Sequence, residues 1–308
     1  MVIVTVLLLT ELKHTFTEFA QRMKNDEMIT LAKFLAISGI ILPMLPHKNL
    51  IPDINLTPYS IWLATVVVSG ISYLSYLLKR YVFHESGVLV SGIIGGLYSS
   101  TATISVLARK SRKASEQEAN EYVAAMLLAV SMMFLRFMIL ILIFSREIFT
   151  SIYPYLLIMS VVAAVVAWFI HSRHRRSKDM ADESEDEDSS NPLEFKVALI
   201  FATLFVVFTV LTHYTLVYAG TGGLNLLSFV SGLSDITPFI LNLLQNTGSV
   251  AVLVVVACSM QAIISNILVN MFYALFFAGK GSKLRPWILG GFGTVIGVNL
   301  VLLLFFYL

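Results

Sequence analysis

Clusters of hydroxyl and carboxyl side chains interrupt two otherwise apolar stretches of the chain. The polar residues of the two clusters are Ser99, Ser100, Thr101 and Thr103, and Ser234, Asp235 and Thr237. Gly95 and Gly96 precede the first cluster and Gly232 precedes the second, and glycine favours a break in a helix. Oxygen side chains after a break can cap the next helix or can bind a ligand. We expect ligand sites at both breaks, with simple capping as the alternative.

Asp235 is the residue with the sharpest chemistry. A carboxylate at membrane depth is rare and usually faces a cavity. Asp235 is therefore expected to bind an ion or to carry a proton, and a structural helix cap is the alternative. Arg136 lies in the middle of the apolar run 132–138. It is equally compatible with a structural partner, such as Asp235 or a helix C-terminus, and with a substrate role.

A third set of polar residues lies in the apolar stretch 250–277. Ser259, Asn266 and Asn270 are spaced so that all three share one face of a helix. In a membrane helix, such a face lines a pathway or hydrogen-bonds to another helix, and both alternatives stay open. In the last apolar stretch, Gly293 and Gly297 form a small-residue face suited to helix packing.

Composition identifies the elements that position these residues. The 308 residues are 57% hydrophobic and 13% charged, which is typical of an all-α polytopic membrane protein. Spans of roughly 20 apolar residues cross a bilayer. The eight predicted spans are residues 1–21, 28–46, 58–79, 120–144, 150–171, 194–219, 250–277 and 286–308. The two breaks lie in further apolar segments, 86–108 and 223–246.

The positions of Lys and Arg favour re-entrant hairpins over full crossings for both broken segments. If both broken segments turn back, nearly all Lys and Arg residues between the spans lie in the cytoplasm, and only Lys48 and Arg146 lie on the other side of the membrane. Full crossings would divide the cations almost evenly. The hairpins then enter from opposite faces, and arms of about 11 residues rise about 16 Å, half of the hydrocarbon core. The tips are expected to meet near the midplane.

Two similar halves flank an acidic segment. Laying Gly87 on Gly223 places Gly96 on Gly232. After an eight-residue shortening of the next loop, Ala129 falls on Ala257. This register predicts an inverted repeat. The predicted units are N-terminal helices 1–57, repeat 58–176, a flexible acidic linker 177–192 and repeat 193–308.

Several classes of function lack their sequence signals. The chain shows no nucleophile paired with a base, no phosphate-binding glycine loop and no His/Cys metal cluster. We therefore expect no enzyme, no nucleic-acid partner and no cofactor other than a bound monovalent or divalent cation. The expected location is the cell (inner or plasma) membrane, crossed several times, with the basic loops and the acidic linker in the cytoplasm.

The segments Gly95–Thr103 and Leu107–Lys110, together with Ser265 and Asn266, resemble a membrane module of bacteria and archaea. That module is a domain of unknown function found C-terminal to an MgtC/SapB-type membrane domain. Asn270 departs from the lysine associated with its position in the module, so a charged role is not carried over to it. The resemblance implies a membrane protein linked to ion homeostasis, here with the MgtC/SapB-like part missing or reduced to residues 1–21.

These observations leave two functions. The first is a transporter or channel for a small ion, with its site between the two hairpin tips. Asp235 and the helix carbonyl ends favour a cation or a cation-coupled substrate, whereas Arg136 and the N–H ends favour an anion. The second is a non-transporting membrane regulator. The expected partners are the lipid bilayer, a small ion, a second copy of the chain and an MgtC/SapB-like domain.

Overall fold

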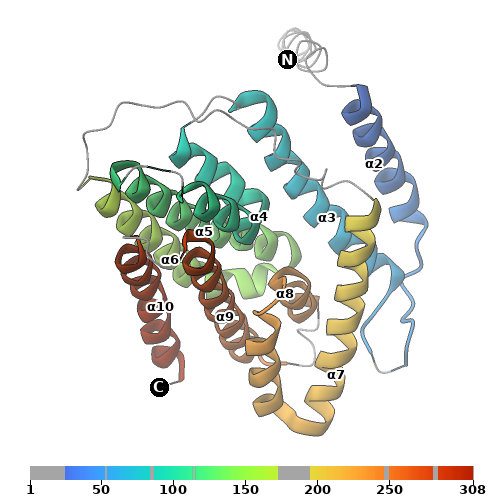
Figure 1. The fold of residues 1–308 in the computed structure, drawn as a ribbon. Coiled ribbons are helices and arrows are strands. Elements are labelled where there is room, and N and C mark those ends of the chain that lie inside the picture. The colour runs from blue at the N-terminus through green and yellow to red at the C-terminus, as the bar shows by residue number, and fades with distance from the viewer. Residues whose placement is uncertain are drawn as a thin grey trace, which may run out of the picture.

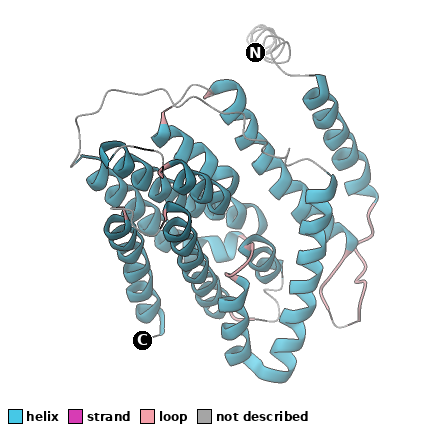
Figure 2. Ribbon diagram, viewed as in Figure 1, coloured by secondary structure: helices cyan, strands magenta, loops and turns pink. Residues whose placement is uncertain are grey.

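The protein is a bundle of helices (Figure 2). The computed structural model describes residues 25–52, 54–83, 87–112, 114, 116–172, 195–245, 250–279 and 284–307. Its helices are α2 Asn25–Met44, α3 Pro58–Leu77, η1 Leu78–Val82, α4 Val88–Lys110, α5 Glu116–Phe144, α6 Arg146–Ser172, α7 Phe195–Ser231, α8 Ile236–Gln245, α9 Val252–Ala278 and α10 Arg285–Tyr307.

The helix lengths and composition confirm the polytopic membrane class. Within the described part, 8 helices are long and apolar enough to cross a membrane. The predicted span 1–21 and the acidic linker 177–192 lie outside the described residues. Every other predicted span coincides with a helix. The predicted shortening of the second loop is wrong, because the gap between Lys110 and Glu116 closely matches the gap between Gln245 and Val252.

Helices α5 and α9 form the core of the bundle. Helix α5 packs against α4 and α6, and α9 packs against α7, α10 and α4. Ala124, Ala125 and Ala129 of α5 are fully buried. Small side chains let helix backbones approach closely, which is a common basis of packing in membrane proteins. The neighbouring α4 uses this space.

Helix α4 doubles back at Ser99, where the backbone leaves the helical region at φ −159° and ψ 106°. A Cβ atom added to Gly95 would lie 2.5 Å from Oγ1 of Thr103. In an unbroken helix, eight residues span about 12 Å, so this contact requires a reversal. Gly96 approaches the Ala129 backbone so closely that an added Cβ would lie 2.5 Å from its Cα. The two glycines are therefore helical and provide space, while the break itself falls at Ser99.

A second reversal lies within α7. Gly220 has φ 60° and ψ −153°, a positive φ that glycine adopts without steric cost. Beyond it, Gly223 packs against Thr215 and Ala219 of the preceding arm. The second arm of α7 ends at Ser231, residues 232–235 form a loop, and α8 follows. This arm, the loop and α8 together make up the second broken segment.

Helix α2 stands at the edge of the bundle beside α3 (Figure 1). A buried carboxylate, Glu27, ties it in place. Arg80 forms an ion pair with Glu27 at 2.7 Å, and the hydroxyl of Tyr76 donates to the same carboxylate at 2.8 Å. Tyr81 also donates to Glu27, and Tyr73 donates to its backbone carbonyl. A buried charge is tolerated when it is paired and hydrogen-bonded in this way.

Candidate functional site

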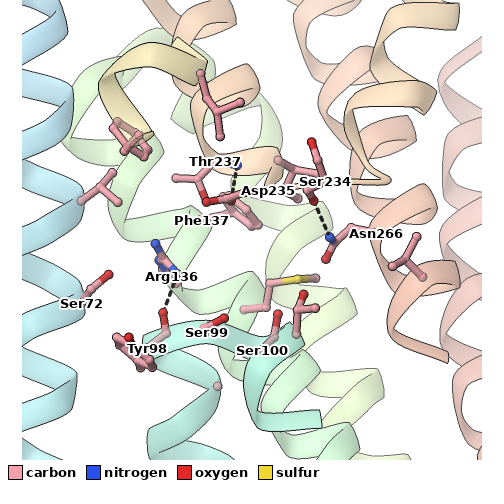
Figure 3. Close-up of a pocket in the computed structure, with 18 of the residues that line it drawn as sticks. Ser72, Tyr98, Ser99, Ser100, Arg136, Phe137, Ser234, Asp235, Thr237 and Asn266 are labelled. Atoms are coloured by element: carbon pink, nitrogen blue, oxygen red, sulfur yellow. Dashed lines mark hydrogen bonds between the residues drawn. The ribbon is translucent and has the colours of Figure 1, made fainter. Parts of the chain in front are cut away.

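Both breaks line one cavity of about 370 Å³. Ser99 and Asp235 are 136 positions apart in the sequence (235 − 99), yet both face this space. Figure 3 shows Arg136 lying between the first break, with Tyr98 and Ser99, and Asp235 of the second. The fold thus brings the two predicted polar clusters together.

At the first break, a side chain of α5 binds the backbone carbonyl that the break leaves free. The Nη1 atom of Arg136 donates to the carbonyl oxygen of Tyr98 at 2.9 Å. The hydroxyl of Ser99 accepts weakly from the backbone N–H of Ala102, at 3.4 Å. Arg136 thus satisfies the end of the first arm, and Ser99 caps the start of the second.

The second break uses different groups for the same purposes. The backbone N–H of Thr237 donates to Oδ1 of Asp235 at 2.9 Å, which caps the start of α8. The side-chain amide of Asn266 donates to the carbonyls of Gly232 and Ser234 at 3.3 and 3.4 Å. These contacts satisfy carbonyls that would otherwise lose their helical partners.

Arg136 and Asp235 are the charged side chains that line the cavity. Both are described residues, and no nitrogen–oxygen distance of 4.0 Å or less joins them as an ion pair. The Nε atom of Arg136 is buried and has no hydrogen-bond partner in the described part of the chain. A buried donor without a partner is costly, and Arg136 as a whole is only partly buried and lines the cavity, so a ligand can reach its guanidinium group.

The remaining wall of the cavity is largely apolar. It is formed by Val68 of α3, by Ile200, Phe201 and Leu204 of α7, and by Val269 of α9. The lining continues to Val197 near the start of α7 and to Tyr273 near the end of α9. Ser234 and Asp235 are exposed, so the cavity is accessible to solvent.

Most of the predicted site residues lie at this cavity. Those that line it are Gly96, Ser99, Ser100, Thr101, Arg136, Ser234, Asp235, Thr237 and Asn266. Gly95 and Thr103 instead face one another inside the reversal of α4. Gly232 packs against Ala262 and Ser265 of α9.

Two predicted residues of α9 lie behind the cavity lining. The hydroxyl of Ser259 donates to the carbonyl of Val255 in its own helix. The amide of Asn270 donates to Oδ1 of Asn266 at 3.2 Å, so it holds Asn266 in position. A shared helix face therefore did not place all three polar residues at one site. Ser259 lies two turns before Asn266, and Asn270 is turned to the other side of Asn266 from the lining residues Val269 and Tyr273.

The sequence prediction missed several groups at the site. The carbonyl of Tyr98 has no signature of its own, because any residue supplies one. Ser69 and Ser72 of α3 also line the cavity, and their i, i+3 spacing in an apolar span was an available signal. The apolar residues of α7 resemble any lipid-facing stretch, and only the folded chain brings them to the cavity.

Comparisons with known proteins place the chain in a family. A family model described as "Domain of unknown function (DUF4010)" matches residues 66–278. A relative from Aquifex aeolicus (strain VF5), named "Uncharacterized protein", is 27% identical over 221 residues, which cover 71% of this chain and 94% of that protein. No solved structure matches the chain significantly. Apart from the first residues of α3, the matched region contains both breaks and every helix that lines the cavity. The chain belongs to the DUF4010 family.

Proposed function

We propose that this protein is a transporter, rather than an enzyme, that moves a small ion or other small charged solute through the cavity between the two breaks. One observation carries the proposal. Two backbone breaks far apart in sequence line a single cavity together with one basic and one acidic side chain. Non-helical backbone at membrane depth is tolerated where it is buried in protein or lines a water-filled cavity, and it often forms the substrate site of transporters.

We further propose that the two broken segments are re-entrant hairpins related by an inverted repeat. The element bounds support a repeat of nearly constant spacing. The start of α5 and the start of α9 are 136 residues apart (252 − 116), and the starts of α3 and α7 are 137 apart (195 − 58). The two breaks have the same spacing, since Ser99 and Asp235 also differ by 136 (235 − 99).

Contacts with α9 support the opposed orientation of the hairpins. The base of the first hairpin lies at the C-terminal end of α9, where Arg112 donates to the carbonyl of Phe276 and Arg109 lies over the ring of Phe277. The second hairpin ends at Gln245, just before α9 begins at Val252. The bases therefore lie at opposite ends of a helix about 40 Å long, at 1.5 Å per residue.

The cavity is proposed to face the cytoplasm in this conformation. Its lining runs toward the start of α7 and the end of α9, the end that carries Arg109, Arg112 and Arg285. The positive-inside rule places such loops in the cytoplasm. In a Cys258→Ala background, single cysteines at Ala114 and Arg285 should label from the cytoplasmic side, and cysteines at Ser145 and Thr221 from the other. Labelling of positions 114 and 145 from the same side would contradict the hairpin arrangement.

Flux measurements with Asp235→Asn test the proposed function. Purified protein in proteoliposomes is expected to support solute flux, and this variant, which keeps the side-chain shape and removes the charge, is expected to lose it. Glu147→Gln, an exposed change at the start of α6, is the matched control. Wild-type flux in Asp235→Asn would leave capping as the role of Asp235. Absence of flux from the wild-type protein would favour the non-transporting regulator.

The predicted homodimer has a candidate surface on α10. Gly290, Gly293 and Gly297 are exposed, and a Cβ atom added to any of them would meet nothing within 4 Å. Small residues on an open helix face favour helix association in membranes. Crosslinking of cysteines introduced at Gly293 would test this pairing, and co-purification would test the predicted MgtC/SapB-like partner.

A further inference from the structure

The size of the cavity is the first indication of what it binds. A volume of about 370 Å³ lies within the roughly 300–1,000 Å³ range of small-molecule pockets. A single dehydrated ion would leave most of this space to water. The cavity therefore fits a small organic molecule, and this inference rests on the proposed function because it concerns the same site.

Arg136 presents an edge suited to a carboxylate. Its Nη1 atom is already bound to the carbonyl of Tyr98, while its buried Nε lacks a partner among the described residues. A guanidinium edge that includes Nε can hold both oxygens of a carboxylate, and charge-assisted bonds of this kind are strong. The contact to Tyr98 also fixes the orientation of that edge before a ligand arrives.

Asp235 offers a matching site for an ammonium group. Its Oδ1 accepts from the N–H of Thr237, and this single contact leaves Oδ2 for a ligand. Asp235 and Arg136 face the same cavity without forming an ion pair. Two opposite charges that line one cavity without contacting each other are each stabilised by a ligand that carries both complementary charges.

The rest of the lining defines the third part of the ligand. Apart from Arg136 and Asp235, the side chains that line the cavity are uncharged, and those of α7 at Ile200, Phe201 and Leu204 are apolar. A charged substituent would find no charged partner among the described residues of α7 that line the cavity. We propose that the cavity binds a small zwitterion of the α-amino-acid type with an apolar side chain, its carboxylate on Arg136 and its ammonium group on Asp235.

Three molecules with the same isobutyl side chain test this assignment. They are L-leucine, 4-methylpentanoate, which lacks the amine, and 3-methylbutylamine, which lacks the carboxylate. Calorimetry on the purified full chain in detergent is expected to show L-leucine binding about 10- to 100-fold tighter than either analogue, the range that one bond to a charged group supplies. L-lysine and L-glutamate are expected to bind more weakly than L-leucine. Equal affinity for L-leucine and either analogue would overturn the assignment.

Two variants give the inference a selectivity readout. Asp235→Asn should remove the preference for L-leucine over 4-methylpentanoate. Arg136→Gln should remove the preference for L-leucine over 3-methylbutylamine. If the Gln variant does not fold, Arg136→Lys, which keeps the charge but loses the two-point contact, should reduce that preference. The exposed Glu147→Gln and Arg146→Gln should keep both preferences. Unchanged preferences in both site variants would place the amino acid elsewhere and contradict the inference.

Flux of labelled L-leucine in proteoliposomes separates this inference from the proposed function. Ion flux without leucine binding would overturn the zwitterion assignment and leave the transporter standing. Leucine binding with the expected selectivity but without flux of any solute would support the site and overturn transport. Leucine flux that both site variants abolish would support both.

Discussion

The two breaks satisfy the same freed backbone groups with side chains of different charge. At the first break, the cationic residue Arg136 donates to the carbonyl of Tyr98, which ends the first arm. At residues 232–235, the neutral Asn266 donates to the carbonyls, and the acidic Asp235 caps the next helix. At the first break, one residue therefore supplies both the donor to the carbonyl and the charge, whereas at the second break two different residues supply them. The cavity between them has a positive side and a negative side as a result.

The largest effect is expected from replacing the glycines that let each break approach its neighbour. In Gly96→Leu the new side chain would meet the backbone of Ala129, and in Gly232→Leu it would meet Ser265 and the carbonyl of Ala262. Overpacking costs about 1–3 kcal/mol and occasionally more. Both variants should lose flux and yield little monodisperse protein. Gly39→Leu, in open space on α2, is the control, and a normal Gly96→Leu variant would contradict the close packing.

Arg136→Gln should affect stability and flux together. It removes the charge and weakens the bond to the carbonyl of Tyr98, and bonds to charged groups contribute about 1.5–3 kcal/mol. Thermal unfolding in detergent should show a lower midpoint, and flux in proteoliposomes should be lost. Arg146→Gln should change neither. Full stability with lost flux would show that the first break does not need Arg136 for its structure.

At the second break the two roles should separate. Asn266→Ala removes the donor to the carbonyls of Gly232 and Ser234, at about 0.5–1.5 kcal/mol per bond, while both cavity charges remain. Its unfolding midpoint should fall further than that of Asp235→Asn, whose changed cap costs at most about 1 kcal/mol. Its flux should exceed that of Asp235→Asn. A lower unfolding midpoint in Asp235→Asn than in Asn266→Ala, or a lower flux in Asn266→Ala than in Asp235→Asn, would argue against separate structural and charge roles at the second break.

The smallest effects are expected from the hydroxyls of the first break. Ser99→Ala removes a cap whose hydrogen bond is already long, 3.4 Å to the N–H of Ala102. A lost cap costs about 0.5–2 kcal/mol, and the lower end is expected here. Thr101→Ala leaves the backbone contacts of the break intact. Both variants should retain more flux than Asp235→Asn, and an equal loss would indicate that the hydroxyls contact the solute directly.

Local sequence signals predicted the elements well where they act over a few residues. Helix α3 begins where Thr57 and Ser60 exchange side-chain to backbone hydrogen bonds around Pro58. Span lengths and apolar composition identified the membrane-spanning class because bilayer thickness fixes the length of a helix. The polar clusters marked both breaks for a similar reason, since exposed helix ends need oxygen and nitrogen partners close by.

Contacts between distant segments were beyond the reach of the same signals. Glu27 and the tyrosines of α3 gave no sign that they meet, because nothing in either segment identifies the other. The sequence suggested a break at Gly95 and Gly96, whereas the backbone turns at Ser99. Glycine marks both flexible and crowded positions, and only the packing of α4 on Ala129 shows that these two are crowded.

By itself, the sequence determined the helical membrane class, the positions of the spans and the two polar interruptions, because hydropathy and capping act within one or two turns of a helix. Only the tertiary structure decided that both interruptions line one cavity, that Arg136 and Asp235 face it unpaired, and that Ser259 and Asn270 lie behind it. These facts depend on how α4, α5, α8 and α9 pack together. Such packing follows from shape complementarity between segments far apart in the chain, which no local pattern encodes.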